Sequence, residues 1–278
     1  MTPRATPPLL RWRWPGSPLF PARLLRRYNR FLADFESEDP AHPGHLVAHC
    51  VNTGRMEALT QPGLRCWLSH DPSPTRKLQY TWQIAELDGH MIGANTAVPN
   101  QLVRALLEAR TLAGFDDWTT MRPEAPYGAN SRVDFLLHDS RGAHYVEVKN
   151  CHLIYPDDIG YFPDSVSERA TKHLEELTSL LAEGHRASVI FTAQRAGVKA
   201  VRPSDAHDPT FAAAARRAAA AGVKFLALEV VPTAEEIQVR RAIPADVEPY
   251  DVAPMKAWMD KNRALGPAWF TVRRSKPE

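Results

Sequence analysis

The 278-residue chain is 44% hydrophobic and carries a formal net charge of +2, so it is long enough for one or two domains with buried cores. Apolar runs are too short to cross a bilayer and no signal-peptide core is present, so we expect a cytoplasmic protein without a membrane partner. The three cysteines show no CxxC spacing, which argues against a disulfide framework or a zinc ribbon.

The first segment, residues 1–17, is rich in proline and arginine, and this composition predicts a disordered extension. Residues 1–33 hold seven arginines and no acidic residue. Such a cluster, with Trp12 and Trp14 between its arginines, also suits contact with a nucleic-acid backbone.

Residues 18–98 contain short strand-like runs separated by turns, a spacing typical of a small barrel. We expect strands around 28–35, 46–51, 65–70, 79–87 and 91–96. A small barrel needs bulky residues inside, so we expect most of its aromatic residues in the core and the others to be available for base stacking. The aromatic residues concerned, among which the sequence does not choose, are Tyr28, Trp67, Tyr80 and Trp82. The basic residues available for phosphate contacts are Arg26, Arg27, Arg30, Arg55, Arg65, Arg76 and Lys77.

Residues 99–245 read as a mixed α/β domain. The pattern predicts a helix over 101–110 and strands over 118–127, 132–137 and 145–149. A capping box from Ser165 to Glu168 then opens a second helix, and strand 188–192 follows. Asp208 caps an Ala-rich helix closed by Gly222, before strand 224–231. Residues 246–278 form a C-terminal extension with a short amphipathic helix expected near 255–265.

Carboxylates and a lysine interrupt two of these strands. Asp134 stands in an apolar run, and Glu147 and Lys149 alternate with valines, which places both on one strand face. The polar connection between the runs has the composition of a hairpin, so antiparallel pairing can bring Asp134 beside Glu147. Two carboxylates that close repel each other unless a cation such as Mg²⁺ neutralises them.

An alternative interpretation needs no metal. Glu147 and Lys149 would then lie on a solvated face, and Asp134 would pair with Arg132 or Arg141. Against it, a buried Asp is costly without a partner. Glu124, on the preceding strand, supplies a further acid. The helix that follows carries a basic cluster of Arg169, Lys172 and His173 near its start.

Several ordered motifs resemble the sugar fermentation stimulation protein family of bacteria and archaea. They are Leu25–Asp34, His49–Met56, Tyr127–Phe135, Glu147–Asn150 and Gly160–Asp164. The resemblance covers about residues 20–245 and implies an OB-like N-terminal β-barrel followed by a PD-(D/E)XK nuclease-like mixed-sheet domain. It also implies DNA binding, a role in regulating sugar-utilisation genes, and a nuclease-type site on Glu124, Asp134, Glu147 and Lys149.

Two hypotheses follow. In the first, the protein is a DNA nuclease in which Asp134, Glu147 and Glu124 hold Mg²⁺ or Mn²⁺ and Lys149 positions water or stabilises the phosphate. In the second, the nuclease-like fold is a scaffold for a non-catalytic DNA-binding regulator. Both assign DNA contacts to the same basic residues, Arg26, Arg27, Arg30, Arg55, Arg169, Lys172 and His173.

Overall fold

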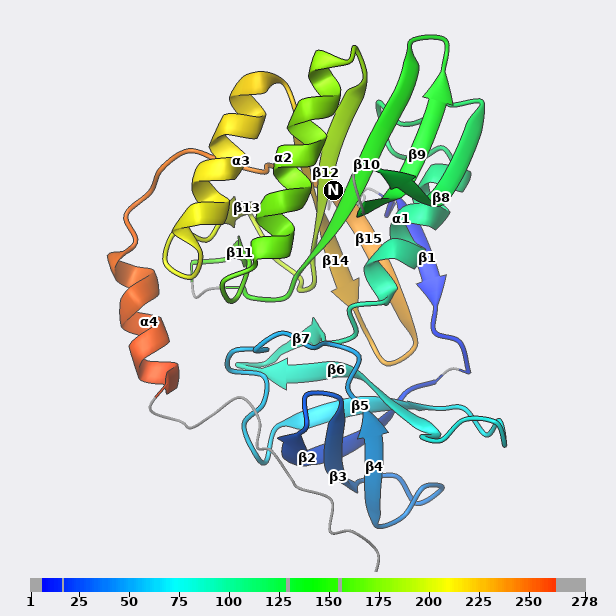
Figure 1. Ribbon diagram of the computed structural model, residues 1–278. Helices are drawn as coiled ribbons and strands as arrows, with labels where there is room; N and C mark the ends of the chain where they lie inside the picture. Colours follow the sequence, from blue (N-terminus) through cyan, green and yellow to red (C-terminus); the bar gives the residue numbers. More distant parts are fainter. Residues whose placement is uncertain (1–6, 17, 129–130, 155–156, 264–278) are drawn as a thin grey trace, which may run out of the picture. The chain divides into compact units, whose positions relative to one another are not determined.

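The structure, a computed structural model, describes residues 7–16, 18–128, 131–154 and 157–263 (Figure 1). Its internal contacts divide the chain into two compact units. One is built mainly from Arg13–Thr96 and is called the barrel domain below. The other is built mainly from Ala97–Val231 and Gln238–Val252 and is called the sheet domain.

The barrel domain is a closed five-stranded β-barrel, as the sequence predicted. Its strands are β2 (Phe20–Tyr28), β3 (Leu32–Ser37), β4 (His45–His49), β5 (Arg65–His70) and β6 (Tyr80–Leu87), and β7 (His90–Gly93) extends the sheet beyond β6. Pairing of β4 with β6 closes the ring. Leu24, Phe35, Leu68 and Trp82 are fully buried inside it, so the barrel has a packed apolar core.

The predicted strand over residues 28–35 is confirmed only for residues 32–35, which begin β3, because the chain turns at residues 29–31. Asn29 and Arg30 have left-handed φ values of 49° and 62°, which joins β2 to β3 in a tight hairpin. β2 itself went unrecognised because a bulge between Leu24 and Arg26 shifts its register. Such a bulge moves the following side chains to the opposite face of the strand. Arg26 therefore points outward and Arg27 inward.

Arg27 is 1% exposed and acts as a structural residue. Its guanidinium donates to the carbonyl oxygens of Asn52 at 2.6 Å, Gly54 at 2.9 Å and Arg30 at 3.0 Å. These bonds tie the β2–β3 turn to the loop that follows β4. The assignment of Arg27 as a DNA contact is therefore wrong, since the group that would contact phosphate is buried and already bonded.

The sheet domain is the expected mixed α/β unit. Within the described residues, seven strands form one sheet in the order β1-β15-β14-β12-β10-β9-β8. β9 pairs antiparallel with β8 and β10, whereas β10, β12 and β14 run parallel. The strands are β8 (Thr120–Tyr127), β9 (Ser131–Asp139), β10 (Gly142–Cys151), β12 (Arg186–Ala193), β14 (Lys224–Pro232), β15 (Glu236–Ile243) and β1 (Leu10–Arg13).

Three helices belong to the sheet domain. They are α1 (Val98–Glu108), α2 (Glu168–Ala182) and α3 (Pro209–Ala221). Figure 1 shows α2 and α3 side by side over the sheet, and both contribute buried residues to its main core. A small parallel pair, β11 (Ile159–Phe162) and β13 (Ala200–Pro203), was not predicted. Both strands are only four residues long, too short for a clear alternation.

Capping residues fix where α2 and α3 begin. The N-cap of α2 is Ser167, whose hydroxyl accepts from the amide of Ala170, rather than Ser165 as the capping-box pattern suggested. Asp208 caps α3 by accepting from the amide of Phe211 at 2.9 Å, and its other oxygen accepts from the amide of Ser167 at 2.8 Å. One carboxylate thus joins the starts of both helices.

The sequence predicted the secondary structure of the C-terminal segment better than that of the N-terminal segment. Leu10–Arg13 form β1, which pairs with β15, so the expected disorder of residues 1–17 is wrong for these four; residues 1–6 and 17 lie outside the described residues. The alternation of Leu10 and Trp12 with arginines is a strand signal that the prolines obscured. The predicted C-terminal helix is present as α4 (Ala253–Arg263). Among the described helices, none is long and apolar enough to cross a membrane.

The structural role of Arg27 can be tested by replacing it with methionine, which keeps the aliphatic length and removes the donors. We expect Arg27→Met to lower the free energy of unfolding of the barrel by roughly 2–4 kcal/mol, because buried carbonyls lose their partners. Urea unfolding followed by tryptophan fluorescence measures it. Arg23→Met, at a half-exposed arginine paired with Glu38, is the control and should cost less than about 1 kcal/mol. Equal losses would contradict the assignment.

Candidate active site

Three acidic residues lie in line across neighbouring strands of the sheet domain. The β9–β10 ladder ends at Val146 opposite Phe135, so its next step sets Glu147 opposite Asp134. On the other side, β8 pairs Pro123 with Phe135 and Ala125 with Val133, which places Glu124 opposite Asp134 in the same register. The convergence predicted from the hairpin is therefore present in the backbone register.

Asp134 is held by two donors from different elements. Its Oδ1 accepts from Nδ2 of Asn100, in the first turn of α1, and its Oδ2 accepts from the amide of Val148, both at 2.7 Å. Burial, and next the charge of Glu147, raise the pKa of this carboxyl from 3.8 to about 6. Arg141 instead binds Asp139 and Asp117, so the proposed Asp134–Arg141 pair is wrong.

Glu147 is 3% exposed and forms the centre of the site. Its Oε1 is 2.6 Å from Nζ of Lys149 and 2.6 Å from Nδ1 of His173. Burial acts to raise the pKa of Glu147, but the charge of Lys149 and the hydrogen bond from His173 outweigh it, so the pKa is lowered. The second oxygen, Oε2, is buried and has no hydrogen-bond partner in the part of the chain that the structure describes.

Tyr127 completes the buried part of the site. Its hydroxyl has no hydrogen-bond partner among the described residues. Burial, followed by the charge of Glu147, raises the pKa of this phenol. Two orphaned oxygens, on Tyr127 and Glu147, therefore lie in one acidic region, and buried polar groups of that kind call for a further ligand or water.

His173 differs from its sequence assignment. It was grouped with the DNA-binding residues, but it is 5% exposed and bonds to Glu147. A signal for this was present, since His173 falls three residues after Ala170 on the buried face of α2. Asn100 was missed as well, and nothing in the pattern around it indicates its contact with Asp134.

A recess of about 610 Å³ opens beside these residues. Glu124 is exposed on its wall and has a left-handed φ of 49°. Arg132, Arg169 and Lys172 line the recess and are exposed, and His173 forms its inner limit. Three cations against two acidic residues, Glu124 and Glu168, leave the lining with a net positive charge, which favours an anionic ligand such as a phosphate.

The barrel residues assigned to DNA are more dispersed. Arg26 binds the buried Asp34 at 2.7 Å and lies over the ring of Tyr28. Arg30 is exposed in the β2–β3 turn, and Arg55 is half-buried. With Arg27 buried, the barrel offers fewer available cations than the sequence suggested.

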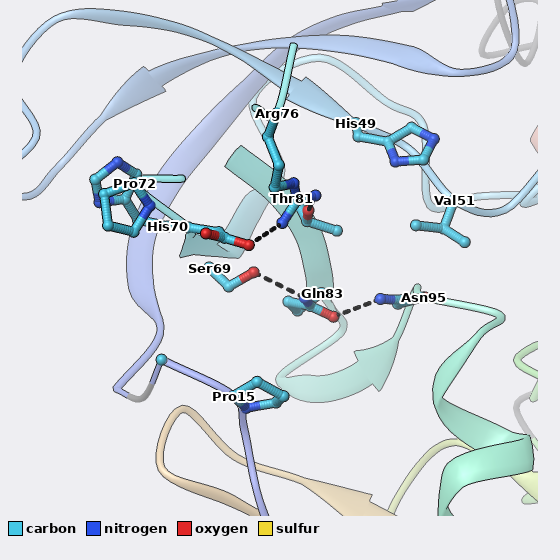
Figure 2. Close-up of a pocket in the computed structure, with 12 residues that line it drawn as sticks. Pro15, His49, Val51, Ser69, His70, Pro72, Arg76, Thr81, Gln83 and Asn95 are labelled. Carbon is cyan, nitrogen blue, oxygen red and sulfur yellow. Dashed lines mark hydrogen bonds and ion pairs between the residues drawn. The ribbon is translucent and has the colours of Figure 1, made fainter. Parts of the chain in front are cut away.

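The barrel domain contains a polar recess of about 390 Å³. Figure 2 shows the side chains that line it. Gln83 crosses it, donating to Ser69 and accepting from Asn95, both at 2.8 Å. Arg76, expected to be available for phosphate, donates instead to Asp71 at 2.9 Å and to Thr81 at 3.1 Å. Its charge is therefore compensated, and this recess is a weaker anion site than the one beside His173.

The fit of a divalent cation rests on Asp134 and Glu147. Among the residues that the structure describes, no group of three or more histidine, cysteine or acidic side chains is arranged to hold a metal. Among the described residues, the buried Oε2 of Glu147 has no hydrogen-bond partner. Burial, and next the charge of Glu147, raise the pKa of Asp134, and a bound cation would offset both effects. Two carboxylates therefore fit a hard cation, with water or Glu124 available to complete its ligands.

Comparison with known proteins gives consistent matches. Residues 25–94 match the SfsA N-terminal OB domain, and residues 97–236 match the sugar fermentation stimulation protein RE domain. The sugar fermentation stimulation protein homolog of Thioalkalivibrio sulfidiphilus is 45% identical over 210 residues, covering 75% of this chain and 87% of that protein. The homolog of Geotalea uraniireducens is 45% identical over 223 residues, covering 80% of this chain and 94% of that protein.

A solved structure also resembles the chain. It is Pyrococcus furiosus SfsA in complex with Ca²⁺, which aligns with a TM-score of 0.77 at 26% identity. The alignment covers 87% of this chain and all of that one. The similarity therefore extends over both domains.

The raised pKa of Asp134 predicts a pH dependence of stability. The native carboxyl titrates at about 6 rather than 3.8, so the native state binds more protons than the unfolded state between these values, and stability falls as pH rises through them. Asparagine does not titrate. In metal-free buffer, the stability of Asp134→Asn relative to wild type should therefore rise by about 2 kcal/mol between pH 4 and pH 7.

Chemical unfolding at each pH measures this difference. Asp88→Asn, at an exposed turn residue, is the matched control for the loss of a carboxyl group. A stability difference between Asp134→Asn and wild type that does not change with pH would contradict the raised pKa of Asp134.

Proposed function

Because this chain belongs to the sugar fermentation stimulation protein family, we propose that it is a DNA-binding protein whose PD-(D/E)XK-type site hydrolyses phosphodiester bonds with a divalent cation. One observation carries the proposal: Asp134 and Glu147 form a buried like-charge pair, and Lys149 is bonded to the second of them. That combination of two acids and a lysine suits metal-assisted hydrolysis.

The carboxylate of Asp134 and Oε2 of Glu147 would hold Mg²⁺ or Mn²⁺. Glu124 would supply a further carboxylate ligand. When bound, the cation lowers the pKa of a water molecule and polarises the phosphate. The relative from Pyrococcus furiosus was solved with Ca²⁺, a hard cation that, like Mg²⁺, takes oxygen ligands. This supports the choice of a hard cation for Asp134 and Glu147 in this chain.

The side chains around the acids have distinct roles in this proposal. Lys149, whose side chain is 12% exposed, places its ammonium where negative charge develops as water attacks phosphorus. His173 fixes the orientation of Glu147 through its 2.6 Å contact. Asn100 does the same for Asp134. Groups held in this way need little rearrangement during the reaction.

DNA would approach through the basic recess. Arg132, Arg169 and Lys172 are exposed there, in a recess that Glu124 and Glu168 also line, and Lys172 lies 3.6 Å from Glu176. Contacts of this type bind the phosphate backbone without reading sequence. The OB-like barrel adds Arg26, Arg30 and Arg55 as further phosphate contacts.

A second candidate function is a non-catalytic DNA-binding regulator of sugar-utilisation genes. It is favoured by the way protein donors already satisfy both oxygens of Asp134 and Oε1 of Glu147. In that function Lys149 and His173 compensate the charge of Glu147, and the acid pair stabilises a scaffold.

Replacing Lys149 by methionine separates the two functions. Lys149→Met keeps the aliphatic bulk and removes a charge that acts mainly in the transition state, so metal-dependent cleavage should fall by at least about 100-fold while DNA affinity changes little. Cleavage and binding are measured on one DNA with Mg²⁺, with Mn²⁺ and with chelator. Lys256→Met, at an exposed lysine of α4, is the control.

Two outcomes would count against the nuclease proposal. Cleavage that survives Lys149→Met would contradict the role of the lysine. Absence of wild-type cleavage with either metal would favour the regulator.

The basic recess predicts salt-dependent DNA binding. The double variant Arg169→Ala/Lys172→Ala should weaken binding to unrelated sequences alike and lower the slope of log affinity against log salt by about 2, because two phosphate contacts are lost. Fluorescence anisotropy at several salt concentrations measures the slope. Lys199→Ala, at an exposed lysine paired with Asp158, is the matched control, and an unchanged slope in the double variant would rule out the recess as the DNA contact.

A further inference from the structure

A second cavity of the sheet domain, of about 500 Å³, lies where β10, β12 and β14 begin. None of the residues assigned to DNA, metal or catalysis borders it. Its wall is largely apolar and includes Phe115, Leu181, Phe225 and Leu226, while three cationic side chains and no acidic one line it. A volume of this size and an apolar wall with a few polar groups are typical of a small-molecule site.

The polar part of the cavity is a fixed histidine–serine pair. Nε2 of His144 lies 2.7 Å from Oγ of Ser188, and both residues are buried. The imidazole stacks on the ring of Phe115, with centroids 5.1 Å apart. Burial, and next the charge of Arg186, lower the pKa of His144 to about 4, so the ring is neutral near pH 7 and can bond to a ligand without adding charge.

The charges around the cavity leave one cation uncompensated. Arg141 binds Asp139 and Asp117, and Arg186 binds the same Asp139 at 2.6 Å. Lys224 is exposed and has no ion pair among the residues that the structure describes. In addition, Nε of Arg186 is buried and donates to no described acceptor. The cavity therefore has one unmatched positive charge and one unused buried donor.

We propose that this cavity binds a small organic monoanion with an apolar body, of the medium-chain or aryl carboxylate class. The carboxylate would meet Lys224 and Arg186, and the apolar body would lie against Phe115 and Phe225. A single uncompensated charge matches a carboxylate better than a phosphate dianion, because the other cations already have acidic partners. Contact with the apolar wall removes hydrocarbon from water and adds to the affinity.

Calorimetric titration of the full chain with octanoate tests the proposal, with octanamide as a neutral probe of the same length and inorganic phosphate as an anion without an apolar body. No nucleic acid or divalent cation is present, so the result is independent of phosphodiester hydrolysis. At constant ionic strength we expect saturable binding of octanoate, at least about tenfold tighter than that of octanamide or phosphate. Lys224→Met should weaken octanoate binding about tenfold and leave octanamide unchanged.

Lys256→Met is the matched control, because it removes another exposed lysine without touching the cavity. A melting temperature equal to that of wild type shows that Lys224→Met is folded. Three results would overturn the proposal: no saturable binding of octanoate up to about 10 mM, equal affinity for octanoate and octanamide, or octanoate affinity that is the same in Lys224→Met as in wild type.

Discussion

The sheet domain is organised around one electrostatic constraint: two carboxylates are buried close to each other. Asp134 and Glu147 lie one step beyond the last residue pair of the β9–β10 ladder, and both the burial of Asp134 and the charge of Glu147 disfavour an ionised Asp134. Each neighbouring element supplies part of the compensation: Asn100 from α1, His173 from α2 and Lys149 from β10 itself. The same bonds that make the acid pair tolerable also fix both helices against the sheet.

The barrel domain also contains a buried charged group, the guanidinium of Arg27. The guanidinium of Arg27 donates to backbone carbonyls of two turns. Carbonyl dipoles stabilise a guanidinium less than a full negative charge does, but three of them satisfy its donors and hold the turns. In both domains, therefore, a buried charged group determines how the loops around it are arranged.

Sequence patterns predicted the features that follow from strict periodicity. The alternation of Val146 and Val148 with Glu147 and Lys149, and the hairpin before them, were enough to predict that Glu147 meets Asp134. Arg27 was misassigned because one bulge reverses the faces of β2, and a bulge leaves no clear mark in the sequence. His173 was misassigned because a basic residue at the start of a helix was taken for a surface residue, although the helical period placed it on the buried face. Asn100 could not be found, since its contact is decided by tertiary packing alone.

The distribution of ion pairs explains why a chain of nearly neutral net charge can still have a basic recess. Many arginines are used within the fold: Arg76 pairs with Asp71, Arg202 with Asp246 and Arg216 with Asp205. Such pairs cancel locally and contribute little to the field at a distance. What a phosphate experiences is set by the few exposed cations that lack this compensation. Because Arg132 and Arg169 line the recess next to His173, the positive potential is concentrated beside the acid pair, where a divalent cation and a phosphate would have to meet.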